Sequence, residues 1–289
     1  MSDLLINSPA GFKWGYTPIT TMGEAHFDTG INFGILKLKG GETRSLAAPL
    51  ESAYLLISGN ATFRYDGKTV ATERLSIFDE APVALHLAAG SKAGLSANSD
   101  CEWAVFQVEN DKAFATCLFD AANMLENEHR GKGLLQDTAY RIVRTIFDFR
   151  NRPEAKLVLG EVVNFPGRWS SYPPHHHPQP EVYHYRFTKP QGYGHGEVGD
   201  QVFMLRQNDT LKIPQGKDHS QVSAPGYGMY YIWVIRHLPE NPYTGPEFTP
   251  AHEWTLAKDA EVWHPDLKLY PVVAKAEDAS DPRRPRAKP

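Results

Sequence analysis

The sequence predicts an all-β fold built from two similar domains in tandem, with a minor helical connector. Much of the 289-residue chain consists of short runs of β-branched and aromatic residues separated by Gly, Pro, Asn and Asp, which is typical of sandwiches and barrels. The second observation is an internal repeat. Residues 85–108 (LHLAAGSKAGLSANSDCEWAVFQV) and 211–234 (LKIPQGKDHSQVSAPGYGMYYIWV) share one pattern of strand, glycine, strand, turn and aromatic-rich strand. We therefore expect one domain over residues 1–135 and a second over residues 136–275.

Two segments do not fit the strand pattern. Residues 111–128 (DKAFATCLFDAANMLENE) place apolar side chains at mixed spacings of three and four before HRGKG, which predicts a helix that connects the two domains. Residues 276–289 (AEDASDPRRPRAKP) are charged and rich in proline, which predicts a frayed tail.

Composition narrows the possible partners. The formal net charge is −4 and no basic stripe is present, which argues against nucleic acid or an anionic membrane surface as a partner and favours a small neutral or anionic ligand. The first residues (MSDLLINSPAGFKWGY) lack the features of a signal peptide, and no stretch has the roughly 20 apolar residues of a membrane helix, so we expect a cytoplasmic protein. Cys101 and Cys117 have no CxxC spacing and are expected to be small core residues.

A histidine triplet in residues 172–187 (YPPHHHPQPEVYHYRF) carries the strongest chemical signal. Successive side chains of a strand point to opposite faces, so His175 and His177 share one face with Glu181, and His176 points away. Residues 214–219 (PQGKDH) form a tight turn that would deliver His219 from a neighbouring strand. Three imidazoles and one carboxylate suit Zn, Mn, Fe or Ni, and the absence of thiolates argues against a closed structural zinc site.

The spacing H-x-H-x-x-x-E followed by P-x-G-x-x-H resembles the two signature motifs of the cupins, small jelly-roll barrels that bind a metal inside the barrel. The segments RWSSYPPHHH, EVYHYRF, PQGYG, PQGKDH and APGYGMYYIWV, after a first half without ligands, more narrowly resemble the 5-deoxyglucuronate isomerase family of inositol catabolism. That resemblance implies a bicupin, a divalent metal and interconversion of 5-deoxyglucuronate with 5-dehydro-2-deoxygluconate, an aldose–ketose isomerisation.

The repeat predicts that the first domain has lost the metal site. Superposing Glu51 on Glu181 places Ser45 and Ala47 where the first two ligands stand in the second domain. The Leu85/Leu211 pairing likewise places Ala93 opposite His219. The first domain would then be a metal-free unit that serves stability or assembly.

Two residues of the first domain follow from the same alignment. Glu51 is expected to make a structural hydrogen bond rather than to hold a metal. His86 pairs with Lys212 in this register, and we expect it to be an ordinary surface residue.

The residues that would act on substrate are less well defined. Tyr183 and Tyr185 share the inward parity of Glu181 and are candidates for substrate contact or proton transfer, with barrel packing as the alternative. Arg186 and His184 point the other way, which favours an interface. A uronate needs a cation for its carboxylate, and the candidates are Arg186, Lys189 and Lys217. His195 lies in a glycine-rich segment (QGYGHGE) and is expected to be an exposed loop residue, with a cover over the barrel mouth as the alternative.

Several other functions share this ligand set. They are an isomerase of pectin-derived 4-deoxy-5-keto-uronate, an iron-dependent cupin dioxygenase and a sugar-binding module without turnover. Exposed sheet edges and a metal-free repeat also favour a homo-oligomer.

Overall fold

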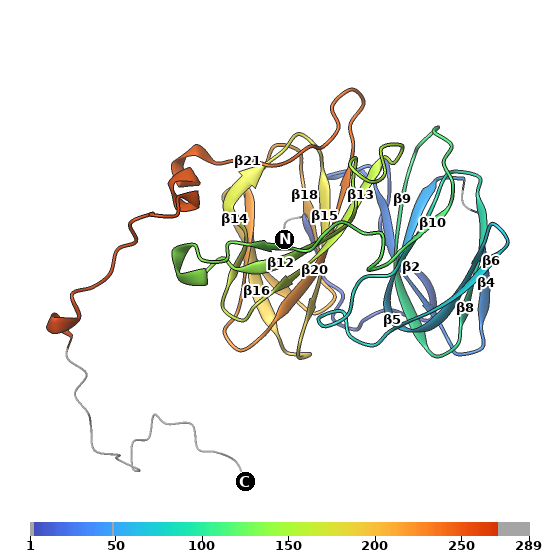
Figure 1. Ribbon diagram of the computed structural model, residues 1–289, viewed down its shortest axis with the longest axis horizontal. Helices are drawn as coiled ribbons and strands as arrows, with labels where there is room; N and C mark the ends of the chain where they lie inside the picture. Colours follow the sequence, from blue (N-terminus) through green and yellow to red (C-terminus); the bar gives the residue numbers. More distant parts are fainter. Residues whose placement is uncertain (1–2, 48, 271–289) are drawn as a thin grey trace, which may run out of the picture.

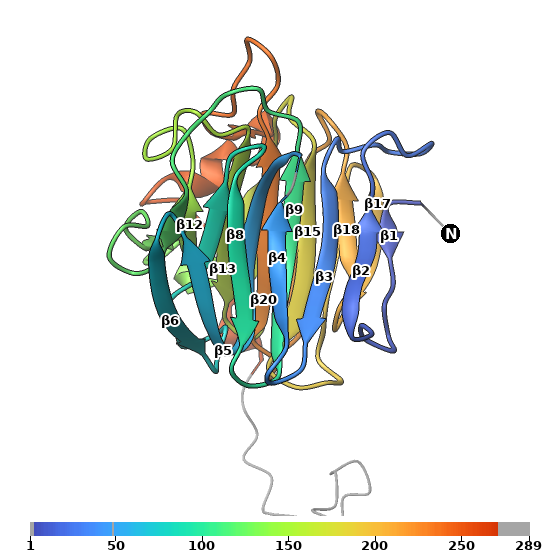
Figure 2. The same ribbon diagram turned by 90° about the vertical axis from the view of Figure 1, so that its right-hand side faces the viewer.

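The computed structural model describes residues 3–47 and 49–270, in which two β-barrels lie side by side (Figure 1). The predicted tail, residues 276–289, lies outside the described residues. The structure has the all-β, jelly-roll architecture that the strand pattern predicts. The view in Figure 2 looks onto the first barrel with the second behind it, and the strands of both run in roughly the same direction.

The first barrel is a nine-stranded sheet in which the long strand β5 pairs with β6, β7, β8 and β9. Its strands are β2 (Gly15–Thr20), β3 (Asn32–Leu38), β4 (Thr43–Ala47), β5 (Glu51–Tyr65), β6 (Lys68–Arg74), β7 (Ala84–Leu87), β8 (Lys92–Ala97), β9 (Cys101–Val108) and β10 (Cys117–Phe119).

The second barrel consists of a seven-stranded and a five-stranded sheet. The larger sheet has the order β1 (Leu5–Ile6), β18 (Thr210–Ile213), β15 (Glu181–Phe187), β20 (Met229–Arg236), β13 (Leu157–Asn164), β12 (Arg141–Phe147) and β11 (Glu128–Arg130). The smaller sheet has the order β17 (Gln201–Arg206), β16 (Tyr193–Val198), β19 (His219–Ser223), β14 (Trp169–His176) and β21 (Glu247–Phe248). Two strands from the first 135 residues, β1 and β11, therefore pair within the second barrel.

The two barrels share a hydrophobic core. One buried cluster joins side chains of β3, β5 and β9 to side chains of β13, β15 and β20, among them Phe33, Phe106, Leu157 and Ile232. Each of these strands is therefore covered on both faces, which explains why all seven residues of β15 are buried. Two further hydrophobic clusters lie inside the barrels, one in each.

Strand β5 turns from one layer of the first barrel to the other at Gly59, which has a φ of +111°. A Cβ atom at this position would lie 2.5 Å from the carbonyl oxygen of Asp100 and from Sγ of Cys101. Only glycine fits both the backbone conformation and the space. Cys101 is buried and Cys117 is half-buried, and both are free thiols.

The helix expected over residues 111–128 is wrong. This segment is extended, forms β10 and then turns at residues 121–124 before β11 begins. Asp120 and Asn123 explain the outcome, because the Asp120 carboxylate accepts from the backbone N–H of Ala122 and the Asn123 side chain accepts from that of Asp120. Such bonds offer the backbone a turn in place of a helix.

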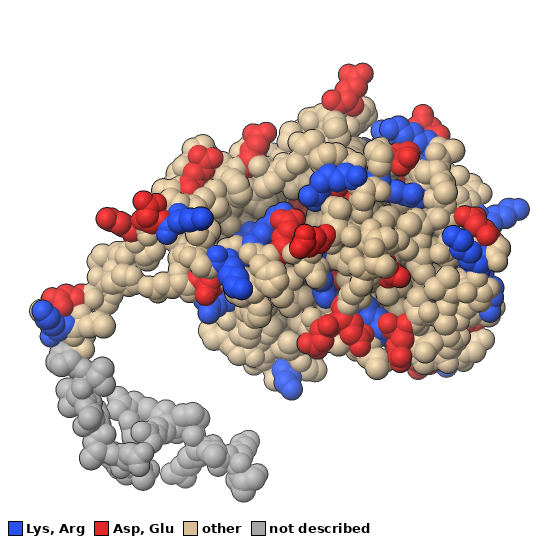
Figure 3. Space-filling view, in the orientation of Figure 1, with Lys and Arg blue, Asp and Glu red and all other residues tan. Residues whose placement is uncertain are grey.

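The helical content of the described residues consists of three short 3₁₀ segments: η1 (Leu135–Asp137), η2 (Pro250–Leu256) and η3 (Leu267–Leu269). Within the same residues, no helix has the length and apolar character to cross a membrane. The face seen in Figure 3 mixes Lys and Arg with Asp and Glu, without a large area of one sign.

The alignment of Glu51 with Glu181 is wrong by one residue. Strand β4 pairs Leu46 with Ala93 where the second barrel pairs His175 with His219. Strand β5 likewise pairs Tyr54 with Leu85 and Val105, and β15 pairs Tyr183 with Leu211 and Trp233. By this register Leu46 replaces His175 and Ser52 replaces Glu181, while Ala93 stands opposite His219 as expected.

A slip of one residue turns a side chain to the other face of its sheet, so Glu51 points out of the first barrel. Its buried carboxylate accepts four hydrogen bonds, from His86 Nε2 (3.0 Å), Asn110 Nδ2 (2.6 Å) and the backbone N–H groups of Lys156 (2.8 Å) and Leu157 (3.0 Å). The expectation of a structural hydrogen bond for Glu51 is confirmed.

The expectation that His86 lies on the surface is wrong. Its side chain is fully buried and stacks on Phe147 and Phe114, with ring centroids 4.3 and 4.8 Å apart. It was misread because β7 is covered on its outer face by these two rings, which come from outside the repeat.

Candidate metal centre

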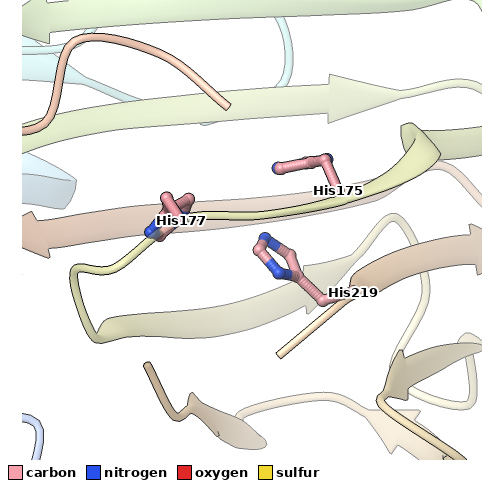
Figure 4. A group of neighbouring side chains, drawn as sticks. All are labelled: His175, His177 and His219. Carbon is pink, nitrogen blue, oxygen red and sulfur yellow. The ribbon is translucent and has the colours of Figure 1, made fainter. Parts of the chain in front are cut away.

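Three histidines converge inside the second barrel (Figure 4). His175 is the last residue but one of β14, and His177 is the first residue after that strand. His219 begins the neighbouring strand β19. His175 and His219 are cross-strand partners. The candidate ligand atoms of the three residues all lie within 4.8 Å of one another, and the side chains are almost completely enclosed.

Glu181, the first residue of β15, brings a carboxylate to the same point. Its Oε2 atom lies 3.3 Å from Nε2 of His177 and 3.4 Å from Nε2 of His219. The structure therefore brings together the four residues that the motif spacing singles out.

The orientation of the imidazoles fits a metal ion. Each histidine has its Nδ1 atom against a backbone carbonyl, an arrangement that places the proton on Nδ1 and leaves the Nε2 lone pair for a metal. The carbonyl partners are Ser171 for His175 (3.2 Å), Gln179 for His177 (2.7 Å) and Lys217 for His219 (3.0 Å). Nε2 of His219 is buried and has no hydrogen-bond partner in the described part of the chain.

Electrostatics favour the ligating protonation states. Burial, reinforced by the neighbouring His219 and His177, holds the pKa of His175 well below its ordinary value, so this imidazole is neutral at pH 7. Burial by itself raises the pKa of Glu181, but the adjacent imidazoles of His177 and His219 outweigh it, and the net shift of this pKa is downward. A neutral imidazole and an ionised carboxylate are the forms that bind a divalent cation.

His176 points away from this cluster. Its Nδ1 atom lies 2.7 Å from the carboxylate of Asp218, and its side chain is one-third exposed. The alternation of β14 thus separates the middle histidine of the triplet from its neighbours.

The cluster lies in a cavity of about 510 Å³. Its wall includes His175, His177, Glu181 and Tyr183. Tyr185 is not among the lining residues, and its hydroxyl donates to Oε1 of Gln221 (3.0 Å). Of the two predicted tyrosines, only Tyr183 reaches the cavity.

The cationic residues that the sequence suggested for binding a substrate carboxylate do not line the cavity. Arg186 makes an ion pair with Glu102 of the first barrel, and His184 packs against Phe33, so both belong to the contact between the barrels. Lys189 and Lys217 are exposed and do not line the cavity.

His195 is half-buried within β16 and pairs with Met204, so the expected loop position is wrong. The loop was expected because two glycines flank this histidine. Gly194 instead lies where neighbouring atoms leave no space, since a Cβ there would approach the carbonyl oxygen of Val222 to 2.5 Å. A Cβ at Gly196 would lie 3.1 Å from a methyl group of Leu205.

Three arginines in the cavity wall were missed by the sequence analysis: Arg130, Arg141 and Arg150. Arg130 and Arg141 are direct cross-strand partners on β11 and β12. The alternation in RIVRTIF places Arg141 on the same face as Val143 and Thr145, which also line the cavity, and was the available signal.

Fold and site together define a bicupin whose second barrel carries a His₃Glu set suited to a divalent metal. A model of the KduI/IolB family matches residues 5–255, and the chain belongs to this family.

Curated relatives point the same way. The chain is 24% identical over 281 residues to the 5-deoxy-glucuronate isomerase of Geobacillus thermodenitrificans, covering 89% of this chain and 97% of that protein. It is 27% identical over 220 residues to the 5-deoxy-glucuronate isomerase of Lacticaseibacillus casei, covering 66% and 78%.

Solved structures support the fold. An IolB-like protein from Salmonella typhimurium LT2 superposes with a TM-score of 0.78 at 23% identity, covering 89% of this chain and all of that one. A cupin 2 conserved barrel domain protein from Leptotrichia buccalis gives a TM-score of 0.50 at 13% identity, covering 80% and 95%.

Proposed function

We propose that the protein is a metal-dependent aldose–ketose isomerase that converts 5-deoxyglucuronate into 5-dehydro-2-deoxygluconate, a step of inositol catabolism. The observation that carries the proposal is the set of four candidate ligands, three histidines and Glu181, of which His175, His177 and Glu181 line a cavity of about 510 Å³. This volume lies within the range of small-molecule sites. The names of the curated relatives support the choice of substrate.

The reaction removes a proton beside a carbonyl and returns it to the neighbouring carbon, with negative charge developing on the oxygens. A divalent metal supplies Lewis-acid stabilisation of that charge when bound. His175, His177, Glu181 and His219 would hold it. Tyr183 adds a hydroxyl to the cavity wall, beside His219, with ring centroids 5.8 Å apart. Burial and the charge of Glu181 hold the pKa of Tyr183 well above its ordinary value, so this hydroxyl acts as a neutral hydrogen-bond donor to substrate oxygen.

The test is turnover in deuterated water. Purified protein loaded with Mn, Zn, Fe or Ni is incubated with 5-deoxyglucuronate, and the product is followed by NMR. We expect ketose formation that a chelator abolishes. Absence of ketose above the chelated control with every metal contradicts the proposal.

Parallel incubations separate the alternatives. Turnover of 4-deoxy-5-keto-uronate in place of 5-deoxyglucuronate indicates the other uronate isomerase. Oxygen consumption by iron-loaded protein indicates a dioxygenase, and equal uronate affinity with and without metal indicates a binding module.

A further inference from the structure

Arg141 is a buried cation that faces the cavity without a carboxylate partner. It is 7% exposed and lines the same cavity as the histidine cluster. Its one hydrogen bond to the described residues runs from Nη1 to the carbonyl oxygen of Ala139 (2.9 Å). No carboxylate in residues 3–47 and 49–270 lies within ion-pair distance of its guanidinium.

The other buried arginines of the described chain all have such a partner. Arg74 and Arg144 both pair with Glu161, and Arg186 pairs with Glu102. The two remaining arginines of the cavity wall are also paired, Arg130 with Glu128 (2.8 Å) and Arg150 with Asp148 (2.7 Å). Burying a guanidinium without a counterion is unfavourable. Among the buried arginines and the arginines of the cavity wall in the described residues, Arg141 is the one that has no carboxylate partner.

The groups around Arg141 favour binding of an anion beside its guanidinium. Arg130 is the direct cross-strand partner of Arg141, and like charges at such positions repel each other. Burial lowers the pKa of Arg141 to about 10, and the charge of Arg130 acts in the same direction, while the guanidinium stays protonated at neutral pH. A carboxylate placed here would offset both effects.

The position of Arg141 relative to the histidines suits a substrate with two functional ends. Tyr231 and Tyr183 lie within electrostatic range of Arg141 and line the same cavity. Their rings lie 4.9 Å apart, and the ring of Tyr183 is 5.8 Å from that of His219. Arg141, the two tyrosines and two of the histidines, His175 and His177, thus line one cavity. A uronate carries its aldehyde and its carboxylate at opposite ends.

We infer that Arg141 is the specificity-determining residue that binds the substrate carboxylate, while the carbonyl end of the substrate faces the histidine cluster. The inference rests on the proposed function for the identity of the substrate. A guanidinium and a carboxylate form paired charge-assisted hydrogen bonds, so the site selects uronates over neutral sugars.

The experiment measures binding of two matched probes, D-glucuronate and D-glucose, to metal-loaded protein by calorimetry. The wild type is expected to prefer glucuronate, and Arg141→Met is expected to weaken glucuronate binding about 10- to 100-fold with glucose binding unchanged. Arg141→Lys should recover part of this loss. Arg150→Met is the matched control, since Arg150 is half-exposed and held by Asp148, and we expect at most about a threefold loss.

Thermal unfolding distinguishes a binding role from a structural one. Because Arg141→Met removes an unpaired buried charge, the ligand-free variant should keep or raise the Tm of the wild type. A lowered Tm, an unchanged affinity for glucuronate, or a wild type without preference for glucuronate would each overturn the inference.

Turnover separates this inference from the proposed function. If glucuronate binding depends on Arg141 but 5-deoxyglucuronate is not converted, the carboxylate subsite stands and the proposed reaction fails. If 5-deoxyglucuronate is converted equally well by the wild type and Arg141→Met, the reaction stands and the subsite fails.

Discussion

The two barrels share their main strand pairing but differ at a few inward positions. Inside the second barrel, His175 and Glu181 line a cavity, and His219 lies beside them. At the corresponding positions the first barrel has Leu46, Ala93 and Ser52, and Leu46 belongs to a packed apolar core. The same scaffold thus supports either a polar site or a hydrophobic core, depending on a few inward positions.

The two glutamates at the starts of β5 and β15 make the contrast sharper. Glu181 faces inward to the imidazoles of His177 and His219, whereas Glu51, shifted by one residue, faces outward to the second barrel. The backbone N–H groups of Lys156 and Leu157, in the second barrel, donate hydrogen bonds to the Glu51 carboxylate. The first barrel therefore has a contact between the barrels where the second has a candidate metal ligand, and each half of this comparison can be tested.

The largest expected effect concerns the inward histidines. His177→Ala removes a ligand, so we expect loss of stoichiometric metal and a fall in kcat/KM of at least roughly 10³. His176→Ala is the matched control and should retain metal, because His176 points to Asp218. Metal analysis and turnover of the two variants check this prediction, and equal metal loss in both would contradict the assignment of faces.

The next effect concerns the outward glutamate. Glu51→Ala leaves His86 Nε2 and two backbone N–H groups without an acceptor and removes one of the two acceptors of Asn110 Nδ2. We expect a loss of about 3–5 kcal/mol in the free energy of unfolding. Metal affinity should be unchanged. Glu181→Ala should do the reverse, with weakened metal binding and little change in the stability of metal-free protein.

Denaturant unfolding in the presence of a chelator, with metal titration in parallel, measures both quantities. Ser52→Ala, one residue along the same strand, is the control and should cost only about 1 kcal/mol. A Glu51→Ala variant as stable as wild type would show that this contact does not hold the barrels together.

A smaller effect appears in the pH dependence of stability. Burial lowers the pKa of His86 below its ordinary value of 6.5, against the opposing effect of Glu51, so the folded protein resists protonation where the unfolded chain accepts it. The resulting stability is present above pH 6.5 and is lost as the pH falls. The pKa of Glu51 is also lowered, because its hydrogen bonds outweigh burial, which extends this loss below pH 4.5.

Replacing His86 by Gln removes one of these titrations. We expect the decline in unfolding free energy between pH 6.5 and 5 to become shallower by up to about 1.4 kcal/mol per pH unit. Other buried histidines titrate equally in both proteins, so the difference between the two slopes isolates His86. Parallel slopes would contradict a neutral, buried His86.

The convergence of the candidate metal ligands could be predicted from sequence because a strand has a period of two. His175, His177 and Glu181 share one parity, and the turn before His219 has its own signature. The same rule placed Tyr183 inward and Arg186 outward. Period and turn chemistry are local properties, and they sufficed for these residues.

The register of Glu51, the place of Arg141 in the cavity wall and the burial of His86 were not predicted correctly, because they depend on contacts with segments distant in sequence, which a local pattern does not contain. Strand β5 is apolar on both faces because it lies between two cores, so its sequence does not distinguish the register of Glu51 from that of Ser52. Arg141 was missed because β11 and β12 lie at the seam between the repeats, outside residues 85–108 and 211–234, over which the repeat was recognised. The burial of His86 depends on Phe114 and Phe147, which are distant in sequence.

The smallest expected effect compares equivalent tyrosines of the two barrels. Tyr54 and Tyr183 occupy the same position in strand pairing, but only Tyr183 lines the cavity. Tyr183→Phe removes a hydroxyl that can donate to substrate, and we expect kcat/KM to fall about tenfold. Tyr54→Phe should alter it by less than about twofold, since its hydroxyl is remote from the metal ligands.

Steady-state kinetics of the two variants, with metal content measured on the same samples, decide this comparison. A tenfold loss with full metal occupancy assigns Tyr183 to substrate contact, whereas reduced occupancy would mean that it supports the ligands. An equal loss in Tyr54→Phe would mean that the first barrel influences catalysis, and the division between a supporting and an active barrel would fail.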